Sequence, residues 1–307
     1  MTDSFRAPRV LGVGFTYLPA LPRAFYREAP IDFMEVAPEE LCRERRALGR
    51  SALTLVPRLL AEAREACAGR PIVVHGVELS IGSAHGWNQA YVDMLDAFFA
   101  EWPFEWHSEH LSFQTVPGSG GEDVAVGMPL PLPFTEEAAS LVGERARRLD
   151  ARYGVPFLLE NPAHYLSEVY CDPGLGNESA FMARVLDRGG CGQLLDLHNL
   201  HCNAVNHGFD ARSALARLPL ERVVEIHVAG GAWRDGFLMD SHSDRVPAEV
   251  WDLLDFVLPR TPNLAGVVYE VLPETSGHLD AATVAGELER VRRALGAAAR
   301  GGMHAVA

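Results

Sequence analysis

The stretch GQLLDLHNLH at residues 192–201 is the starting point for predicting the fold. It begins as a short apolar run after Gly190 and Cys191, which is typical of a buried strand. The run then turns to carboxylate, imidazole and carboxamide side chains, which are costly to bury without partners. If the strand continued to His198, Asp196 and His198 would lie on the same face. The same pattern, an apolar run that ends in His, Asp or Glu, recurs along the chain.

Eight short apolar runs predict strands, and most are separated by stretches with helical periodicity. The strands are expected at residues 10–15, 32–36, 72–75, 106–111, 156–160, 193–196, 223–228 and 266–270. Helices are expected at residues 40–68, 88–102, 135–153, 178–188, 247–258 and 280–295, with room for only a short one between 16 and 31. Pro57 would kink or split the first of these long helices.

Strands that alternate with helices indicate a parallel sheet, and eight such units predict an α/β fold, a single (β/α)8 TIM barrel. A doubly wound open sheet is the alternative, but Gly12-Val13-Gly14 lacks the third glycine of a phosphate-binding turn. No break in composition marks a domain boundary, so we expect the barrel domain over residues 1–296 and a flexible tail at 297–307. Loops at 114–132 and 230–245 are long enough to act as lids.

The composition excludes several classes of function. The 307 residues carry a formal net charge of -14 without a basic run, which argues against nucleic-acid binding. No apolar run approaches the ~18 residues that span a membrane, and the N-terminus lacks the apolar segment of a secretory signal. The five cysteines are scattered and odd in number, which favours a reducing cytoplasm over a disulfide framework.

Chemistry is expected at the carboxyl ends of the strands, where parallel barrels have their active sites. The candidates at or after these ends are His75, His110, Glu160, Asp196, Asn199, His227, Asp240, His242 and Glu270. Each alone is more often a hydrogen-bonded structural residue. Together they would repel one another or stay unpaired unless cations bridged them, and imidazole with carboxylate suits Zn, Mn or Fe(II). The sequence therefore predicts a site for more than one metal ion, in which Glu160 could bridge two ions about 3.5–4 Å apart.

Spaced motifs over most of the chain carry a resemblance to a known family. They are His75-Gly76, Leu79-Ser80-Ile81-Gly82, Ser108-Glu109-His110-Leu111-Ser112, Pro131-Leu132-Pro133-Phe134-Thr135, Leu159-Glu160-Asn161-Pro162, Leu194-Leu195-Asp196, Asn206-His207-Gly208-Phe209-Asp210, Glu225-Ile226-His227-Val228-Ala229-Gly230 and Asp240-Ser241-His242. The chain resembles the DUF692 proteins, the multinuclear non-haem iron-dependent oxidative enzymes, which include the methanobactin-maturing enzyme. This family is similar in fold to the xylose-isomerase-like TIM barrels, and its metal set parallels that of endonuclease IV.

The resemblance implies a ligand set for each metal. One metal would take His75, His110 and Glu160, and a second would share Glu160 and add Asp196, His227 and Glu270. A third would take Asp240 and His242, with Asn199 at the matching place. Family members usually have Asp-Val-Asn-Asn where this chain has Asp-Leu-His-Asn followed by His201, so His198 and His201 stay open as alternatives to Asn199. Gly230-Gly231 also replaces a common Gly-His.

The resemblance also implies an activity. Two or three iron ions, Fe(II)/Fe(III), would use O2 as co-substrate to modify a ribosomally made precursor peptide, typically at cysteine. Glu160, Asp196 and His227 would be catalytic through the metals they hold. A separate peptide-recognition protein usually presents the precursor.

Three other functions remain open from the sequence. A metal-dependent phosphodiester hydrolase of the endonuclease IV type would use the same ligands, although the acidic charge weighs against it. A sugar isomerase would need a lysine or another base beside two metals, and the chain contains no lysine. A degenerate barrel could also serve only as a scaffold for a partner, although the ligand set looks complete.

Overall fold

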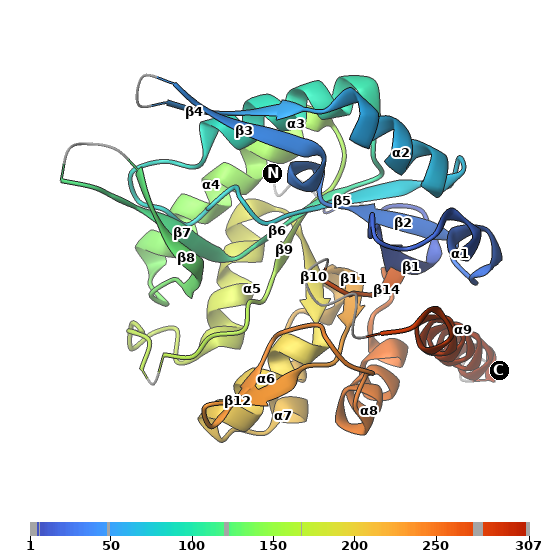
Figure 1. The fold of residues 1–307 in the computed structure, drawn as a ribbon. Coiled ribbons are helices and arrows are strands. Elements are labelled where there is room, and N and C mark those ends of the chain that lie inside the picture. Colours follow the sequence, from blue (N-terminus) through green and yellow to red (C-terminus); the bar gives the residue numbers. More distant parts are fainter. Residues whose placement is uncertain are drawn as a thin grey trace.

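The computed structural model describes residues 5, 7–47, 50–119, 123–166, 168–272 and 279–304. Its centre is a closed barrel of eight parallel strands in the order β1-β14-β11-β10-β9-β6-β5-β2 (Figure 1). The strands are β1 Gly12–Thr16, β2 Phe33–Val36, β5 Ile72–Gly76, β6 His107–His110, β9 Phe157–Glu160, β10 Gly192–Asp196, β11 Val223–Val228 and β14 Gly266–Tyr269. The predicted TIM barrel is confirmed, and each predicted strand overlaps one strand of the barrel.

A helix follows each barrel strand and covers the outside of the barrel. These helices are α1 Arg23–Glu28, α2 Pro57–Cys67, α3 Gln89–Glu101, α4 Glu136–Tyr153, α5 Glu178–Gly189, α6 Leu197–His207 with the short α7 Ala211–Leu215, α8 Ala248–Val257 and α9 Ala281–His304. Short 3-10 turns lie at Pro38–Leu41, Leu220–Arg222 and Leu258–Arg260. Within the described part of the chain, no helix is long and apolar enough to cross a membrane.

The helix starts follow from side chains that accept backbone N–H bonds. Asn88, Thr135, Asn177 and Asp196 each accept a hydrogen bond from the amide three residues later, which satisfies a donor that the first helical turn leaves free. Helix α9 continues to His304, so it includes residues 297–304 of the stretch that the sequence predicted as a flexible tail. Residues 305–307 lie outside the described residues.

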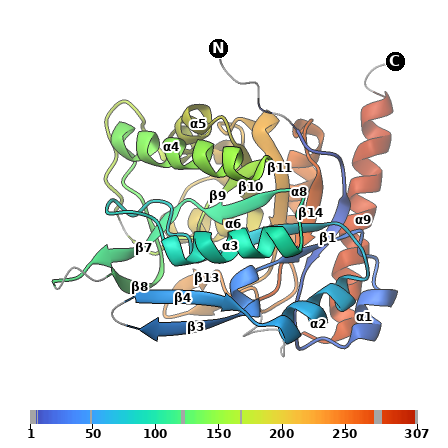
Figure 2. The same cartoon turned by 90° about the horizontal axis from the view of Figure 1, so that it is seen from above.

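Three β-hairpins are inserted between a strand and its following helix, at the carboxyl ends of the barrel strands (here called the mouth). They are β3 Cys42–Ala47 with β4 Arg50–Leu55, β7 Ser112–Pro117 with β8 Asp123–Pro131, and β12 Ala232–Arg234 with β13 Phe237–Met239. In Figure 2 they lie on the side of the barrel opposite to the two termini. The helix predicted for residues 40–68 is therefore wrong before Pro57, where the first hairpin stands. The predicted lid loop at 230–245 contains the hairpin of β12 and β13, and the one at 114–132 overlaps most of the hairpin of β7 and β8.

The barrel interior changes from apolar to polar along each strand. A floor of buried apolar side chains fills the lower interior: Phe33, Val73, Trp106, Leu158, Leu194, Val224, Ala265 and Val268. Gly14 belongs to the same level, because a Cβ there would meet the ring of Phe33 at 2.4 Å. Since side chains two apart on a strand point the same way, the interior also receives the residues two positions beyond Gly14, Phe33, Val73, Trp106, Leu158, Leu194 and Val268. These residues are polar, and they form most of the candidate site. On β11, whose pairing with β10 is irregular, His227 takes the corresponding place.

Candidate metal centre

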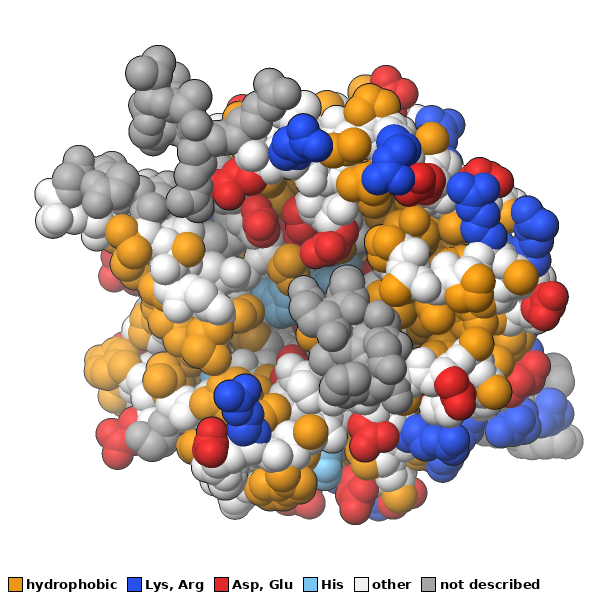
Figure 3. Space-filling model, in the orientation of Figure 1, with side chains coloured by type: hydrophobic (Ala, Val, Ile, Leu, Met, Phe, Trp, Pro, Cys, Tyr) orange, Lys and Arg blue, Asp and Glu red, His pale blue; other side chains and the backbone are white. Residues whose placement is uncertain are grey.

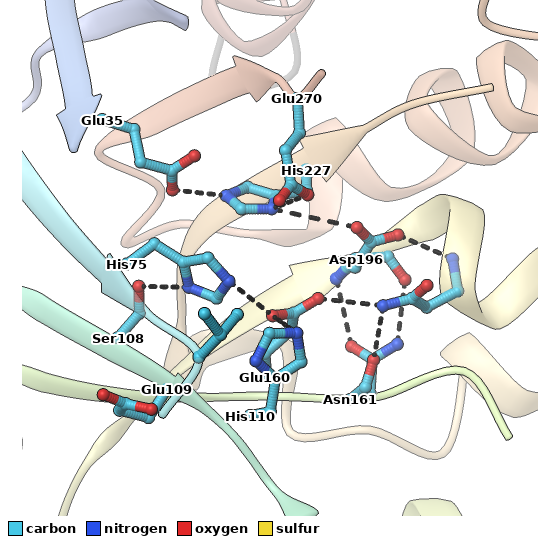
Figure 4. A network of polar contacts seen from close by, with 12 residues as sticks. Glu35, His75, Ser108, Glu109, His110, Glu160, Asn161, Asp196, His227 and Glu270 are labelled. Carbon is cyan, nitrogen blue, oxygen red and sulfur yellow. Dashed lines mark hydrogen bonds and ion pairs between the residues drawn. The ribbon is translucent and has the colours of Figure 1, made fainter. Parts of the chain in front are cut away.

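One polar side chain from each barrel strand, or from the residue that follows it, forms a layer above the apolar floor. The members are Thr16, Glu35, His75, Ser108, Glu160, Asp196, His227 and Glu270, and all of them are buried. His110 lies two residues beyond Ser108 on β6 and extends the layer toward the mouth. Figure 4 shows most of these side chains converging from different strands. Figure 3 shows histidine at the bottom of a hollow near the centre of one face.

The first candidate metal position lies between His75, His110 and Glu160. The Nε2 atoms of both histidines lie 3.2 Å from Oε2 of Glu160. The ring of His75 is oriented by Ser108, whose hydroxyl donates to the carbonyl of Val74 and therefore accepts from His75 Nδ1 at 3.0 Å. This leaves the lone pair on His75 Nε2 facing the carboxylate, which is the arrangement that a metal ligand needs.

Two further candidate groups continue from the first: one shares Glu160 with it, and the next shares Asp196 with the second. The ligand atoms of Glu160, Asp196 and His227 lie within 4.8 Å of one another, as do those of Asp196, His242 and Glu270. His227 Nδ1 lies 2.8 Å from Glu270 Oε2, and His242 Nδ1 lies 3.2 Å from the same oxygen. Glu160, Asp196 and Glu270 thus connect neighbouring positions, as expected of a multinuclear site.

Asp196 has two functions because it ends β10 and also precedes α6. Its Oδ1 accepts the amide of Asn199 at 2.6 Å and caps the helix, while its Oδ2 lies 3.8 Å from His227 Nδ1. The capped helix begins at Leu197, so the strand ends at Asp196, as predicted, and His198 does not share a strand face with it. His198 instead lies on the first turn of α6, with Nε2 at 3.5 Å from the thiol of Cys202.

The electrostatics of the layer show many acidic groups buried together. Burial, with the nearby carboxylates of Asp196 and Glu270, raises the pKa of Glu160 well above its ordinary value. Burial is also the main cause that raises the pKa of Asp196 to about 7. Burial alone would lower the pKa of His227, but the carboxylates of Glu35 and Glu270 raise it well above the usual range. The protein without cations therefore holds extra protons in this layer, and bound cations could replace them.

Several buried ligand atoms of the layer also lack a hydrogen-bond partner among the described residues. They include Nε2 of His75, Oε2 of Glu160 and Oδ2 of Asp196, and beside the layer Oδ1 of Asn199 is in the same state. Buried polar atoms are rarely left in this state unless an ion or water completes them. The donor set contains imidazole and carboxylate, which suits iron, manganese or zinc. The residues present therefore fit a cluster of metal ions.

The nine residues predicted as metal ligands lie around this interior layer. His75, His110, Glu160, Asp196, His227, His242 and Glu270 belong to the groups described above. Asp240 contacts His242 at 2.5 Å, between Oδ1 and Nε2. Asn199 donates from Nδ2 to Oε1 of Glu160 at 2.9 Å, so it contacts the carboxylate shared by two groups. Whether each residue binds metal stays a prediction.

Two buried carboxylates of this region were not predicted from the sequence. Glu35 lies 2.8 Å from His227 Nε2, and Glu225 lies 4.0 Å from the same atom. With His227 they form a further group of possible ligands. The sequence signal that could have found them is a carboxylate inside an apolar strand: Glu35 follows Phe33 by two residues, and Glu225 precedes His227 by two residues.

Comparison with known proteins agrees with this architecture. The structure resembles an L-ribulose 3-epimerase (TM-score 0.55, 14% identity, 96% of this chain and 98% of that one). It also resembles a xylose isomerase-like TIM barrel protein from Mycobacterium smegmatis in complex with magnesium (TM-score 0.53, 14% identity, 95% and 97%). At these identities the likeness shows the fold alone.

Other proteins share a higher sequence identity with this chain than these two structures do. A UPF0276 protein of Bordetella pertussis is 36% identical over 235 residues, which is 75% of this chain and 76% of the relative. A UPF0276 protein of Anaeromyxobacter sp. is 34% identical over 226 residues, 74% and 73% respectively. Residues 11–295 match the family described as RiPP precursor modification enzyme MbnB/TglH/ChrH. The chain therefore belongs to this family of enzymes that modify ribosomally synthesised precursor peptides.

Proposed function

We propose that this chain is an iron-dependent, O2-using oxidase that modifies a ribosomally made precursor peptide at a cysteine. The observation that carries the proposal is the interior layer, in which His75, His227 and several carboxylates are buried within contact distance of one another. The partly exposed His110 and the buried His242 join the same groups of possible ligands. Such a donor set binds Fe(II) without thiolates, so the substrate could supply a sulfur ligand. Family membership supports the precursor peptide as the substrate class.

Two or three iron ions would be held by residues of different strands. His75, His110 and Glu160 would hold one ion, and Glu160 would share a second with Asp196, His227 and Glu270. His242 and Asp240 would hold a third together with Asn199. Bound iron would supply the redox chemistry with O2, which protein side chains alone do not provide.

The surrounding residues of the chain fix these ligands. The Oδ1 atom of Asn161 accepts a hydrogen bond from the backbone N–H of Asp196 at 3.1 Å, and its Nδ2 donates one to the carbonyl of Asp196 at 2.9 Å. Asn199 bonds Glu160 at the same time, so α6 and the end of β9 are tied together at the ligands. A rigid ligand set of this kind orients metal and substrate without rearrangement during the reaction.

The mouth offers surfaces for a peptide and for a partner protein that presents it. Exposed apolar side chains lie on two of the hairpins and on the loop after β9: Val116, Val124, Met128, Leu166, Tyr170, Trp233 and Phe237. Next to Asn161, a cavity of about 360 Å³ opens between the start of α5 and the helices α6 and α7, with Phe134, Met182 and Leu200 among its lining residues. Apolar surface of this kind is typical of protein and peptide binding sites.

The test is iron loading followed by reaction with a peptide. The protein is purified without oxygen, its metal content is measured by elemental analysis, and Mössbauer spectra report the iron environment. O2 uptake and peptide mass are then followed with a cysteine-bearing peptide encoded next to the gene, with and without its neighbouring partner protein. Two or three irons per chain and peptide-dependent O2 uptake support the oxidase. Tightly held zinc with cleavage of an abasic duplex would instead favour the hydrolase, and no bound metal would refute both.

A further inference from the structure

His227 is held between two carboxylates that approach its ring from opposite sides. Its Nδ1 lies 2.8 Å from Oε2 of Glu270, and its Nε2 lies 2.8 Å from Oε2 of Glu35. Figure 4 shows the two carboxylates on either side of the ring. On the Nδ1 side lies Asp196, with Oδ2 at 3.8 Å, and Glu160 completes that group. The candidate metal ligands are therefore on one side of the ring, and Glu35 is on the other.

Glu35 is built into the barrel in a way that fixes its orientation. It lies on β2, is 1% exposed, and follows Phe33 of the apolar floor by two residues. Its second oxygen, Oε1, accepts a hydrogen bond from the hydroxyl of Thr16 on β1 at 3.1 Å. One carboxylate oxygen is thus satisfied by Thr16, and the other is directed at His227.

An imidazole that binds metal through one nitrogen commonly donates its other N–H to a carboxylate. This hydrogen bond sets which nitrogen carries the proton and how the ring is oriented. We infer that Glu35 is a positioning residue for the metal centre, because it accepts the Nε2 proton of His227 and so directs the Nδ1 lone pair toward Asp196 and Glu160. The inference rests on the metal centre of the proposed function and adds a residue that does not itself bind the ion.

Glu225 makes a second arrangement conceivable, in which Glu35 binds a cation itself. Its Oε1 lies 4.0 Å from His227 Nε2, and its Oε2 accepts a hydrogen bond from Trp106 Nε1 at 2.8 Å. A cation among Glu35, Glu225 and His227 would make Glu35 a ligand instead of a positioning residue. However, the short contact between Glu35 and His227 already has the length of a hydrogen bond between a ring N–H and a carboxylate. Removing Glu225 therefore separates the two arrangements experimentally.

The chain contains a matched control for a buried Glu–His pair. Glu109 Oε1 lies 3.1 Å from His107 Nε2, and both side chains are buried on the outer side of β6, because they alternate with Ser108. The pair resembles Glu35–His227 in chemistry and burial but does not face the metal layer. The variants are therefore Glu35→Ala, Glu35→Gln, Glu225→Gln and Glu109→Gln in the full chain.

The experiment is anaerobic titration with Fe(II) alone against a competing chelator, with Mössbauer spectra of the loaded proteins and circular dichroism to check folding. For Glu35→Ala we expect about 10–100-fold weaker binding of one iron and a change in the spectrum of that iron only. Glu35→Gln keeps an acceptor oxygen and should recover most of the affinity. Glu225→Gln and Glu109→Gln should bind as the unchanged protein does.

Two results would overturn the inference while leaving the metal centre intact. Unchanged iron affinity and spectra in Glu35→Ala would show that His227 needs no such support. Loss of one iron both in Glu35→Ala and in Glu225→Gln would place a cation between these carboxylates. By contrast, an unchanged protein that binds no iron would refute the proposed function itself, and the inference with it.

Discussion

Replacing Glu160 with glutamine tests the metal centre at its most shared residue. Oε2 of Glu160 lies 3.2 Å from Nε2 of His75 and from Nε2 of His110, while Oε1 accepts from Asn199. Glutamine has the same shape, and its carbonyl oxygen can keep the bond from Asn199. Its amide nitrogen then faces the two histidines, and a nitrogen that carries two protons cannot bridge cations.

We expect Glu160→Gln to lower the stability of the metal-bound protein but not that of the metal-free protein. When the free concentration of each ion is about 100 times its Kd, two ions add about 5 kcal/mol to the free energy of unfolding. For a chain of this size, that corresponds to a rise of about 10–20 °C in Tm. We expect Glu160→Gln to lose this rise.

In the metal-free protein the ionised carboxylate of Glu160 lowers the free energy of unfolding, because burial is the main cause that raises the pKa of this group well above its ordinary value. The folded protein binds more protons at this group than the unfolded chain, so stability falls as the pH rises above the unfolded pKa. At pH 8 a neutral glutamine removes this cost. The metal-free variant should therefore be as stable as the unchanged protein or more stable.

The assay is thermal unfolding at pH 8 under anaerobic conditions, with and without Fe(II), together with iron content by elemental analysis. Glu109→Gln is the control, because Glu109 is also a buried carboxylate, and burial raises its pKa to about 8. The control should keep the full iron-dependent rise in Tm. If Glu160→Gln also kept that rise and its iron, Glu160 would not bridge metals and the proposed ligand set would be wrong.

Three further predictions concern the metal-free protein, its floor and a helix cap. Burial raises the pKa of Asp196 to about 7 and that of Glu225 to about 8, so the folded chain keeps these protons to a higher pH than the unfolded chain does. In urea unfolding with a chelator present, the free energy of unfolding should therefore fall from about pH 6.5 to 8. A free energy of unfolding that rises over this range would contradict the prediction. Leu194→Ala leaves a cavity in the apolar floor and should lower the free energy of unfolding by about 2–5 kcal/mol, whereas a change near zero would show that the floor collapses to fill it. Thr135→Ala removes the hydroxyl that accepts the amide of Ala138 at 3.1 Å, which should cost about 1 kcal/mol by the same assay without altering iron content.

The barrel and most of its candidate ligands could be predicted from the sequence, because both depend on local patterns. Most barrel strands are short apolar runs that are buried on both faces, and such runs stand out against the amphipathic helices between them. The exception is β6, whose four residues are His-Ser-Glu-His. The carboxyl ends of parallel strands meet at one end of a barrel, so polar residues at the end of each run had to converge. His75, Glu160 and His227 lie in the layer for this reason.

The hairpin that replaces the predicted helix at residues 40–56 shows where local patterns are ambiguous. Leu48 and Leu55 are spaced as on a helix, and the arginines and glutamates that precede Leu48 favour helix formation. In the structure, the backbone of Cys42–Ala47 pairs with that of Arg50–Leu55, and β4 lies along α3. Tertiary contacts of this kind override propensity, and a single sequence does not contain them.

Glu35 illustrates a different limit, because its role depends on closure of the barrel. It is separated from His227 by 192 positions, and β1 and β14 stand between their strands in the sheet. Within its own strand, Glu35 is one carboxylate between Met34 and Val36 and does not end the apolar run. Only the register of the closed barrel places it at the height of His227. The residues that orient metal ligands can therefore come from strands whose ends carry no ligand, and the interior level of each side chain is a better guide to them than its place at a strand end.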